Sequence, residues 1–378
     1  MLAKVGNIIN YLEELAPPGL AAKWDNSWLQ VGNREQEVST VLVALDLDQQ
    51  VLSEALGHRA QLIVTHHPLW LKPPMNIDEN RPQGSLIARI IRNEITVYSA
   101  HTNLDLTRVN RLLADRIGLK QVGREVVEVV SEDRLLKLVT FVPEGHEERI
   151  RQALAGAGAG WIGRYSHCSF QASGIGTFKP REDTAPFIGE PGRLERVPEL
   201  RLETILPASL SNKVVAALLK AHPYEEVAYD LYPLQQAGEQ LGFGLLGSLE
   251  SPMVMEEILQ RCTEKLGVTG LRYWLPAGGD KKVFRRVAVG GGSGGSLVEP
   301  AARKGAELLI SGDIGHHDLL AASSYGMALV DAGHFWTEWP VVDYVAGYLR
   351  KCLVDECYQT GVVSAGAKLA VKWKFYQG

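Results

Sequence analysis

Short apolar runs rich in β-branched residues recur along the chain, and a segment with helical periodicity follows most of them. Their apolar character is continuous rather than alternating, which is typical of strands buried on both faces. The pattern therefore predicts an α/β fold with βα units that build a largely parallel sheet covered by helices. The predicted strands are Ser39–Leu45, Gln61–Thr65, Ile95–Ala100, Arg286–Val289, Glu307–Ser311 and Ala328–Val330.

A polar or glycine-rich group stands at the carboxyl end of each of these runs. In open α/β sheets the carboxyl ends of the strands form the edge at which loops converge and ligands bind. The sequence therefore predicts a functional site at this edge. The groups are Asp46, the pair His66 and His67, His101, Gly290–Gly295, Asp313 and His334.

The middle of the chain, residues 125–237, lacks these edge groups. Its pattern predicts the order β-α-β-β-α-β, which is typical of a ferredoxin-like α+β domain inserted into a main domain formed by residues 1–124 and 238–378. The loop Lys179–Pro198, with four acidic residues and four prolines, is predicted to be a mobile excursion within it. The segment His222–Glu226 is interpreted as a turn or packing element, since no other ligand-type residues lie near it in the sequence.

Two adjacent histidines, His66 and His67, close one predicted strand, and Pro68 biases His67 away from helical geometry. Taken alone, a pair of adjacent histidines is commonly exposed to solvent or part of a helix cap. Neighbouring strand residues face opposite ways, so both rings can serve one site only where the strand opens into a loop or where two metals lie on either side. Their position at the end of a strand favours a functional role.

Two carboxylates follow other predicted strands. Asp105 lies just before a predicted helix, Val109–Leu119, so it is either a helix N-cap or a ligand that joins His101 at the edge. Pro340 is tolerated in a first helical turn, which predicts a helix that begins near Thr337 with Glu338 at its start. Glu338 then either interacts with the helix dipole or acts as a ligand beside His334.

Together these positions supply three or four histidines and two carboxylates. Nitrogen and oxygen ligands of this kind suit Zn, Fe, Mn or Ni, and five ligands exceed what one catalytic metal with open positions needs. Two divalent cations that share a bridging carboxylate would use all five. The predicted ligands are His66, His67, Asp105, His334 and Glu338.

Two further motifs lie near the same edge. Gly290–Gly295 fits GxGxxG, a dinucleotide fingerprint, although five glycines in six satisfy many patterns and an anion-cradling loop or a tight turn is the alternative. Asp313 is predicted to support a ligand or to face a substrate. His317 and Asp318 are interpreted with equal weight as supporting residues or as surface residues of the following helix.

Composition and charge indicate which partners and which cellular compartment to expect. The net charge of −5 offers no basic field for phosphate backbones, so nucleic acid is not expected as a main partner. The four cysteines are scattered without a CxxC pair, which indicates a reducing compartment. Without a signal peptide or a membrane-length apolar run, the expected location is the cytoplasm.

At these residues the whole chain resembles the NGG-one-interacting-factor-three-like family, the "dinuclear metal centre, hexameric" proteins often labelled GTP cyclohydrolase 1 type 2 homologues. The resemblance rests on ordered motifs and extends to the longer bacterial members, whose additional domain is similar to regulators of the PII and CutA type. The motifs are Trp24-Asp25-Asn26 with Leu29–Gly32, Thr65–Leu69, His101–Asp105, Ser311–Asp313 with His317-Asp318, Gly333-His334 with Glu338, and in the insert Gly160–Gly163 and Ala221–Glu226.

The resemblance implies the same five metal ligands, two divalent cations per subunit and a toroidal homohexamer with the metal sites facing an internal cavity. It implies metal-assisted hydrolysis of a nucleotide or another small molecule, with GTP suggested by the label and with His101 or His317 as a proton shuttle. The competing interpretation is a non-enzymatic protein that binds, senses or delivers metal. One departure is visible, because Trp28 stands where a small residue, usually glycine, is expected.

Overall fold

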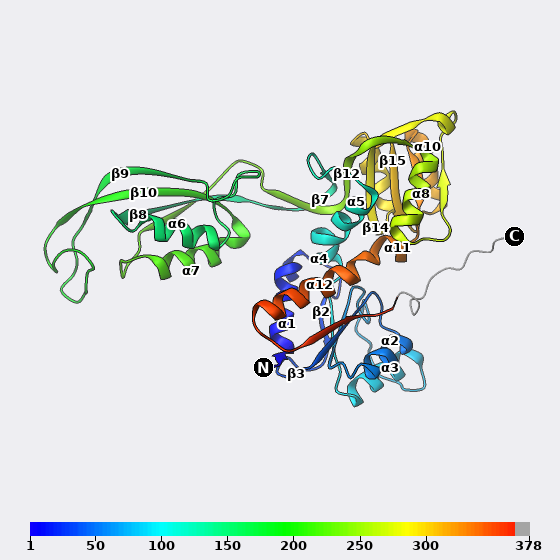
Figure 1. The fold of residues 1–378 in the computed structure, drawn as a ribbon, viewed down its shortest axis with the longest axis horizontal. Helices are drawn as coiled ribbons and strands as arrows, with labels where there is room; N and C mark the ends of the chain where they lie inside the picture. Colours follow the sequence, from blue (N-terminus) through cyan, green and yellow to red (C-terminus); the bar gives the residue numbers. More distant parts are fainter. Residues whose placement is uncertain (367–378) are drawn as a thin grey trace. The chain divides into compact units, whose positions relative to one another are not determined.

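The computed structural model describes residues 1–366, and the chain divides into two compact units. The main unit is formed by Met1–Val130 and by the chain from Gly242 onward, and the inserted unit is formed by Ser131–Leu241. Figure 1 shows the elements of both units. Within the described residues, no helix is long and apolar enough to cross a membrane.

The main unit contains two large sheets and a two-stranded sheet of β1 (Ala3–Lys4) and β3 (Glu37–Val38), and the first large sheet contains most of the remaining amino-terminal strands. Its order is β17-β4-β5-β6-β2, with β17, β4, β5 and β6 parallel and β2 antiparallel. Alternate residues face opposite cores: Val41 and Val43 pack with helices α1 and α12, whereas Leu42 packs with α2 and α3. Burial on both faces explains the continuous apolar runs. The bounds are β2 Trp28–Val31, β4 Thr40–Ala44, β5 Leu62–Thr65, β6 Thr96–Ser99, β17 Gly361–Ser364, α1 Val5–Leu15, α2 Gln49–Gly57, α3 Pro82–Arg92 and α12 Pro340–Asp355.

The second sheet of the main unit has the order β13-β16-β15-β14-β12-β7, with β14, β15 and β16 parallel. The predicted α/β fold with mostly parallel sheets is confirmed, and the six predicted strands divide equally between two of these sheets. Apolar periodicity shows which faces are buried but does not determine which strands pair. The bounds are β7 Glu125–Asp133, β12 Glu239–Val254, β13 Arg272–Trp274, β14 Val283–Ser293, β15 Leu308–Gly312 and β16 Ala328–Asp331, with α8 Met255–Leu266, α9 Val298–Arg303 and α10 His316–Tyr325 beside them.

Two helical segments link the two sheets of the main unit. The first continues from β6 as α4 (Thr102–Leu104), a π-helical turn (Asp105–Val109) and α5 (Asn110–Ile117), and α5 packs into the core of the second sheet. The second follows β16 as α11 (His334–Glu338) and α12, whose Val341 and Val345 lie in the core of the first sheet. These crossings bring the carboxyl ends of strands from both sheets to one place.

The inserted unit has the predicted ferredoxin-like order. Its four strands form an antiparallel sheet in the order β11-β8-β10-β9, and helices α6 and α7 contribute to its core. The predicted loop Lys179–Pro198 is shorter in the structure, because β10 already begins at Glu195, which pairs with Phe178 of β9. The bounds are β8 Leu135–Pro143, α6 Glu147–Gly156, β9 Ser169–Phe178, β10 Glu195–Pro207, α7 Ser211–Ala221 and β11 Tyr229–Pro233.

Candidate metal centre

His66 and His67 follow β5 and point into one buried cluster of polar side chains. Their backbone N–H groups donate to the carbonyls of Ala44 and Leu45 at 3.2 and 2.9 Å, so the strand pairing continues through both residues. The Nδ1–H of His66 donates to the Ala100 carbonyl at 2.9 Å. The ring centroids lie 5.0 Å apart and the rings are tilted by 43°, so each histidine serves a different side of the cluster.

His101 follows β6 and is held beside this pair. Its Nδ1–H donates to Oδ1 of Asp25 at 2.9 Å, and its backbone N–H donates to Ser27 at 3.2 Å. Its ring centroid lies 5.3 Å from that of His66 and 5.4 Å from that of His67. Although burial acts to raise the pKa of Asp25, hydrogen bonds, chiefly from His101, hold that pKa well below its usual value. Asp25 therefore stays ionised and orients His101.

Asp105 is not the predicted helix N-cap, because Val109 is the N-cap residue of α5. Helix α4 begins at Thr102, three residues earlier than Asp105, and the carboxylate that accepts the Thr102 backbone N–H belongs to Asp25, at 3.0 Å. Asp105 lies in the following π-helical turn, where its Oδ1 is 3.3 Å from Nε2 of His66. Of the two interpretations of Asp105, the geometry is compatible with the ligand and excludes the cap.

His334 and Glu338 form the ends of the short helix α11. The prediction that a helix begins near Thr337 was wrong, because the helix already begins at His334 and Glu338 is its last residue. The two side chains are one helical turn apart, which places Nε2 of His334 3.1 Å from Oε2 of Glu338. Glu338 is buried, with 3% of its surface exposed.

The Glu338 carboxylate lies between two groups of side chains. Oε2 is 3.0 Å from Nε2 of His67 and 3.1 Å from Nε2 of His334, whereas Oε1 is 3.8 Å from Nε2 of His66, which in turn contacts Asp105. Three groups of described residues have the spacing of metal ligands: His66, His67 and His101 form one, and the other two are His67, His334 and Glu338, and His66, Asp105 and Glu338. Glu338 is the member that the last two groups share.

The histidines on the Glu338 Oε2 side are oriented by carboxylates outside the cluster. Nδ1 of His67 lies 2.8 Å from Asp46, and Nδ1 of His334 lies 2.7 Å from Asp313. Because a carboxylate accepts, Nδ1 carries the hydrogen in both rings. Each neutral ring then presents the Nε2 lone pair to the cluster, which is the arrangement typical of metal-bound histidines.

Several of these inward atoms lack a partner. While the histidine rings are neutral, Nε2 of His66, Oδ1 of Asp105 and Oε2 of Glu338 are buried without a hydrogen-bond partner. Nε2 of His67 lies 3.3 Å from Nε2 of His334, so two acceptors face each other unless one ring is protonated. Buried acceptors that converge without donors are costly unless protons or a cation neutralise them, and the imidazole nitrogens and carboxylate oxygens are a ligand set that could hold a divalent transition metal.

Protons supply part of this charge in the metal-free chain. Hydrogen bonding to Glu338 raises the pKa of His334 to about 9, with Asp313 adding to the effect. Burial acts to lower the pKa of His66, but Asp105 and Glu338 outweigh it and raise that pKa well above its usual value. Burial likewise acts to raise the pKa of Glu338, yet the histidines, led by His334, hold it well below its usual value. Metal binding at this cluster must therefore displace protons.

The glycine run 290–295 serves this cluster rather than a dinucleotide. Its backbone N–H groups are already used, because Gly291 donates to Asn110, Gly292 to Thr337 and Gly294 to Gly312. A Cβ at Gly292 would stand 2.2 Å from Oε1 of Glu338. Gly292 therefore leaves room for the shared Glu338 carboxylate. The N–H groups that already donate within the protein are not available to bind the phosphates of a dinucleotide.

The structure brings seven of the eight predicted site residues together and leaves His317 apart. Asp313, with a backbone φ of +53°, orients His334 as a supporting residue. His317 is exposed on α10 and its ring faces that of His316, and it belongs to none of the ligand-type groups in the described residues. Two supporting carboxylates, Asp25 and Asp46, were not predicted as site residues, although Asp46 stands at the strand edge and Asp25 lies in the Trp24-Asp25-Asn26 motif.

The chain is similar to known proteins over nearly its whole length. A model of the Duf34/NIF3 (NGG1p interacting factor 3) family matches residues 3–365. The GTP cyclohydrolase 1 type 2 homolog of Halalkalibacterium halodurans is 41% identical over 366 residues, 96% of this chain and 97% of that protein. The Bacillus subtilis protein of the same name is 41% identical over 330 residues, 87% of each chain. The crystal structure of the Bacillus cereus protein related to NIF3 superposes with a TM-score of 0.89 at 37% identity and 100% coverage of both chains.

Proposed function

The chain belongs to the Duf34/NIF3 family, and from this premise we propose that it binds two divalent metal ions and uses them for hydrolase-type chemistry. The observation that carries the proposal is the position of Glu338 between two groups of side chains with the spacing of metal ligands. His67 and His334 belong to one group, and His66 belongs to the other. One ion would be held by His67, His334 and Glu338, and the other by His66, Asp105 and Glu338. Both groups offer only nitrogen and oxygen atoms, which suit Zn, Fe, Mn or Ni.

Divalent ions held in this way polarise a substrate oxygen and make a water nucleophile available at neutral pH. The chain itself contributes acid–base groups and orientation. His101 lies against His66 and His67 without belonging to either group that contains Glu338, and Asp25 fixes its tautomer. We assign to His101 the transfer of a proton between substrate and solvent through its Nε2.

A non-enzymatic function in metal binding, sensing or delivery is the second candidate. One observation favours it, since Nε2 of His66, Oδ1 of Asp105 and Oε2 of Glu338 are all buried, which leaves little accessible surface at the shared carboxylate. A substrate the size of GTP needs a pocket of roughly 300–1,000 Å³ in contact with the metals. The name shared by the relatives points to GTP, but we expect this chain to turn over GTP slowly or not at all.

The family resemblance also favours a homohexamer, which light scattering on the purified protein would test. In such an assembly other copies of the chain would complete the surroundings of each site. The metal-binding residues themselves all come from one chain.

The functional proposal is tested by comparing metal-stripped and metal-reloaded protein in hydrolysis assays with GTP and with generic phosphoester and amide substrates. We expect any hydrolysis to require metal and to be lost in His67→Ala, whereas His317→Ala, which changes a histidine outside the cluster, should retain it. Full metal content with no hydrolysis of any substrate would support the metal-handling function. Brisk, metal-dependent GTP turnover that is abolished by His67→Ala would overturn our expectation for GTP.

A further inference from the structure

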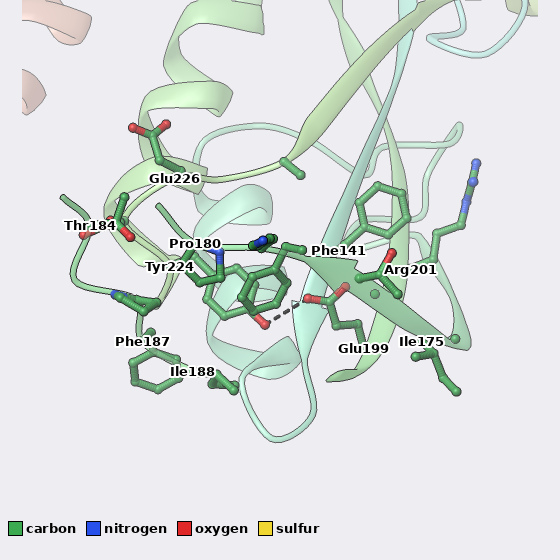
Figure 2. Close-up of a pocket in the computed structure, with 18 of the residues that line it drawn as sticks. Phe141, Ile175, Pro180, Thr184, Phe187, Ile188, Glu199, Arg201, Tyr224 and Glu226 are labelled. Carbon is green, nitrogen blue, oxygen red and sulfur yellow. Dashed lines mark hydrogen bonds between the residues drawn. The ribbon is translucent and has the colours of Figure 1, made fainter. Parts of the chain in front are cut away.

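The inserted unit contains a cavity of about 660 Å³ that is unrelated to the metal centre (Figure 2). Its volume falls within the range of small-molecule binding sites, roughly 300–1,000 Å³. Strand β9, the loop 179–194, strand β10 and the turn 222–226 line it. All of these segments belong to the inserted unit, so the cavity exists within a single chain.

A buried carboxylate, Glu199 on β10, lies in the wall of this cavity. Only 7% of its surface is exposed. The Tyr224 hydroxyl donates to its Oε1 at 2.9 Å, as Figure 2 shows, whereas Oε2 has no hydrogen-bond partner among the described residues. Burial and the contact with Glu199 raise the pKa of Tyr224 well above its usual value, so that the hydroxyl keeps its proton and remains the donor.

No salt bridge joins Glu199 to a cation of the described chain, although Lys179, Arg181 and Arg201 line the same cavity. Arg201, two residues along the same strand, donates instead to Glu203 at 2.8 Å. Arg181, at the rim of the cavity, pairs with Asp183 at 3.5 Å. An ionised carboxylate that is buried without a charged partner is costly, and the cost is offset only when a donor or cation reaches it.

Neighbouring residues hold this carboxylate in position. The His222 side chain bridges the turn, since its Nε2–H donates to the Phe141 carbonyl at 3.1 Å and its Nδ1 accepts the Tyr224 backbone N–H at 3.1 Å. A Cβ at position 176 would lie 1.8 Å from Oε2 of Glu199, so the glycine there provides the space that this oxygen occupies. The segment 222–226, interpreted from the sequence as a turn or packing element, thus places Tyr224 against Glu199.

Three aromatic rings line the same cavity as this carboxylate. The ring centroid of Tyr224 lies 6.0 Å from that of Phe178 and 6.2 Å from that of Phe187. Aromatic faces attract cationic nitrogen and also bury apolar surface. A carboxylate with an unused acceptor, set among aromatic rings, is complementary to a positively charged N–H group carried on an apolar body.

We propose that this cavity is a binding site for a small organic cation, an amine or amidine on an apolar or aromatic body, whose N–H group donates to Oε2 of Glu199. The rings of Phe178, Phe187 and Tyr224 would contact the body of the ligand. This site is independent of the metal centre and assigns a ligand-binding role to the inserted unit.

The test is isothermal titration of the full-length protein with benzamidine, compared with benzyl alcohol, which has a similar ring without the charge. We expect saturable binding of one benzamidine per chain and much weaker binding of benzyl alcohol. Glu199→Gln should weaken benzamidine binding at least about tenfold, because hydrogen bonds to charged groups are the stronger class. Glu148→Gln, a matched change on α6 of the same unit and outside the cavity lining, should leave it unchanged.

Circular dichroism and metal content, measured on each variant, verify that the fold and the metal centre are intact. If Glu199→Gln disturbs the fold, Phe187→Ala provides the second variant, since Phe187 is 52% exposed on the loop and its loss should still weaken binding. Equal binding of benzamidine and benzyl alcohol, unchanged affinity in Glu199→Gln, or no saturable binding would overturn the proposal. Binding of guanosine but not of benzamidine, dependent on Glu199, would also overturn it, because the ligand would then be a neutral N–H donor.

Discussion

Replacing Glu338 with glutamine should remove the feature that joins the two metal sites. Glutamine keeps the shape of the side chain and one acceptor oxygen, but it loses the negative charge and replaces the second oxygen with a donor. If the amide nitrogen takes the Oε2 position, it replaces the oxygen that lies 3.0 Å from Nε2 of His67 and 3.1 Å from Nε2 of His334. In either orientation the variant can offer an oxygen to only one of the two groups.

The size of the effect follows from the position of Glu338. Loss of a residue that merely supports a metal ligand costs roughly 10- to 100-fold in metal affinity, about 1.4–2.7 kcal/mol. Glu338 contacts both groups directly and is 3% exposed, so water cannot replace the lost oxygen without rearrangement. We therefore expect a loss at the upper end of that range or beyond for at least one ion.

Elemental analysis of protein reloaded with zinc and freed of excess metal measures this effect. The unchanged chain should hold about two ions, Glu338→Gln at most one, and Asp105→Asn about one, because Asp105 belongs to a single group. Glu299→Gln is the matched control, since Glu299 is exposed and pairs only with Arg303 at the surface. Two tightly held ions in Glu338→Gln would refute the reasoning that this carboxylate is shared.

Three further predictions address stability and organisation. The pKa of His334 is raised from 6.5 to about 9 in the folded protein without metal, so the stability that the protonated ring contributes is present below pH 6.5 and is lost as the pH rises through 9. Urea unfolding in EDTA should therefore show that the free energy of unfolding decreases on the order of 1 kcal/mol between these pH values, and a constant free energy would contradict this. Replacing residues 131–241 with a short linker should leave a soluble, metal-binding main unit, and an unfolded product by circular dichroism would count against an independent insert. Trp28→Gly should unfold at the same temperature as the unchanged chain or higher, because Trp28 has a φ of +140° and the relief of about 1–3 kcal/mol of backbone strain outweighs the entropy cost of glycine. A clear loss of thermal stability would show that the contacts of the indole ring contribute more than the strain costs.

The buried strands were predictable because their chemistry is local. A strand covered on both faces is apolar along its buried stretch, as Val41–Ala44 of β4, Leu62–Val64 of β5 and Leu308–Ile310 of β15 are. The histidines were predictable from position rather than type, since the carboxyl ends of buried parallel strands are where loops converge and ligands bind. These two patterns together located the sheet edge at which the metal cluster lies.

The remaining details depend on contacts that are distant in sequence. Asp105 resembled a helix cap because the residue that performs the capping, Asp25, lies 77 residues from Thr102 in the chain. Asp46 is separated by 21 residues from His67, which it orients, and nothing in its local sequence indicates that partner. The division into two sheets likewise arises from strand pairing across the chain, which periodicity does not encode.

The central claim, a dinuclear centre joined by Glu338, is tested most directly by a crystal structure of the metal-loaded protein with anomalous data at the absorption edge of the metal. We predict two anomalous peaks about 3.5–4 Å apart, one beside His67 and His334 and the other beside His66 and Asp105, with the Glu338 carboxylate between them. A single peak at full occupancy, or two peaks that do not both contact Glu338, would contradict it.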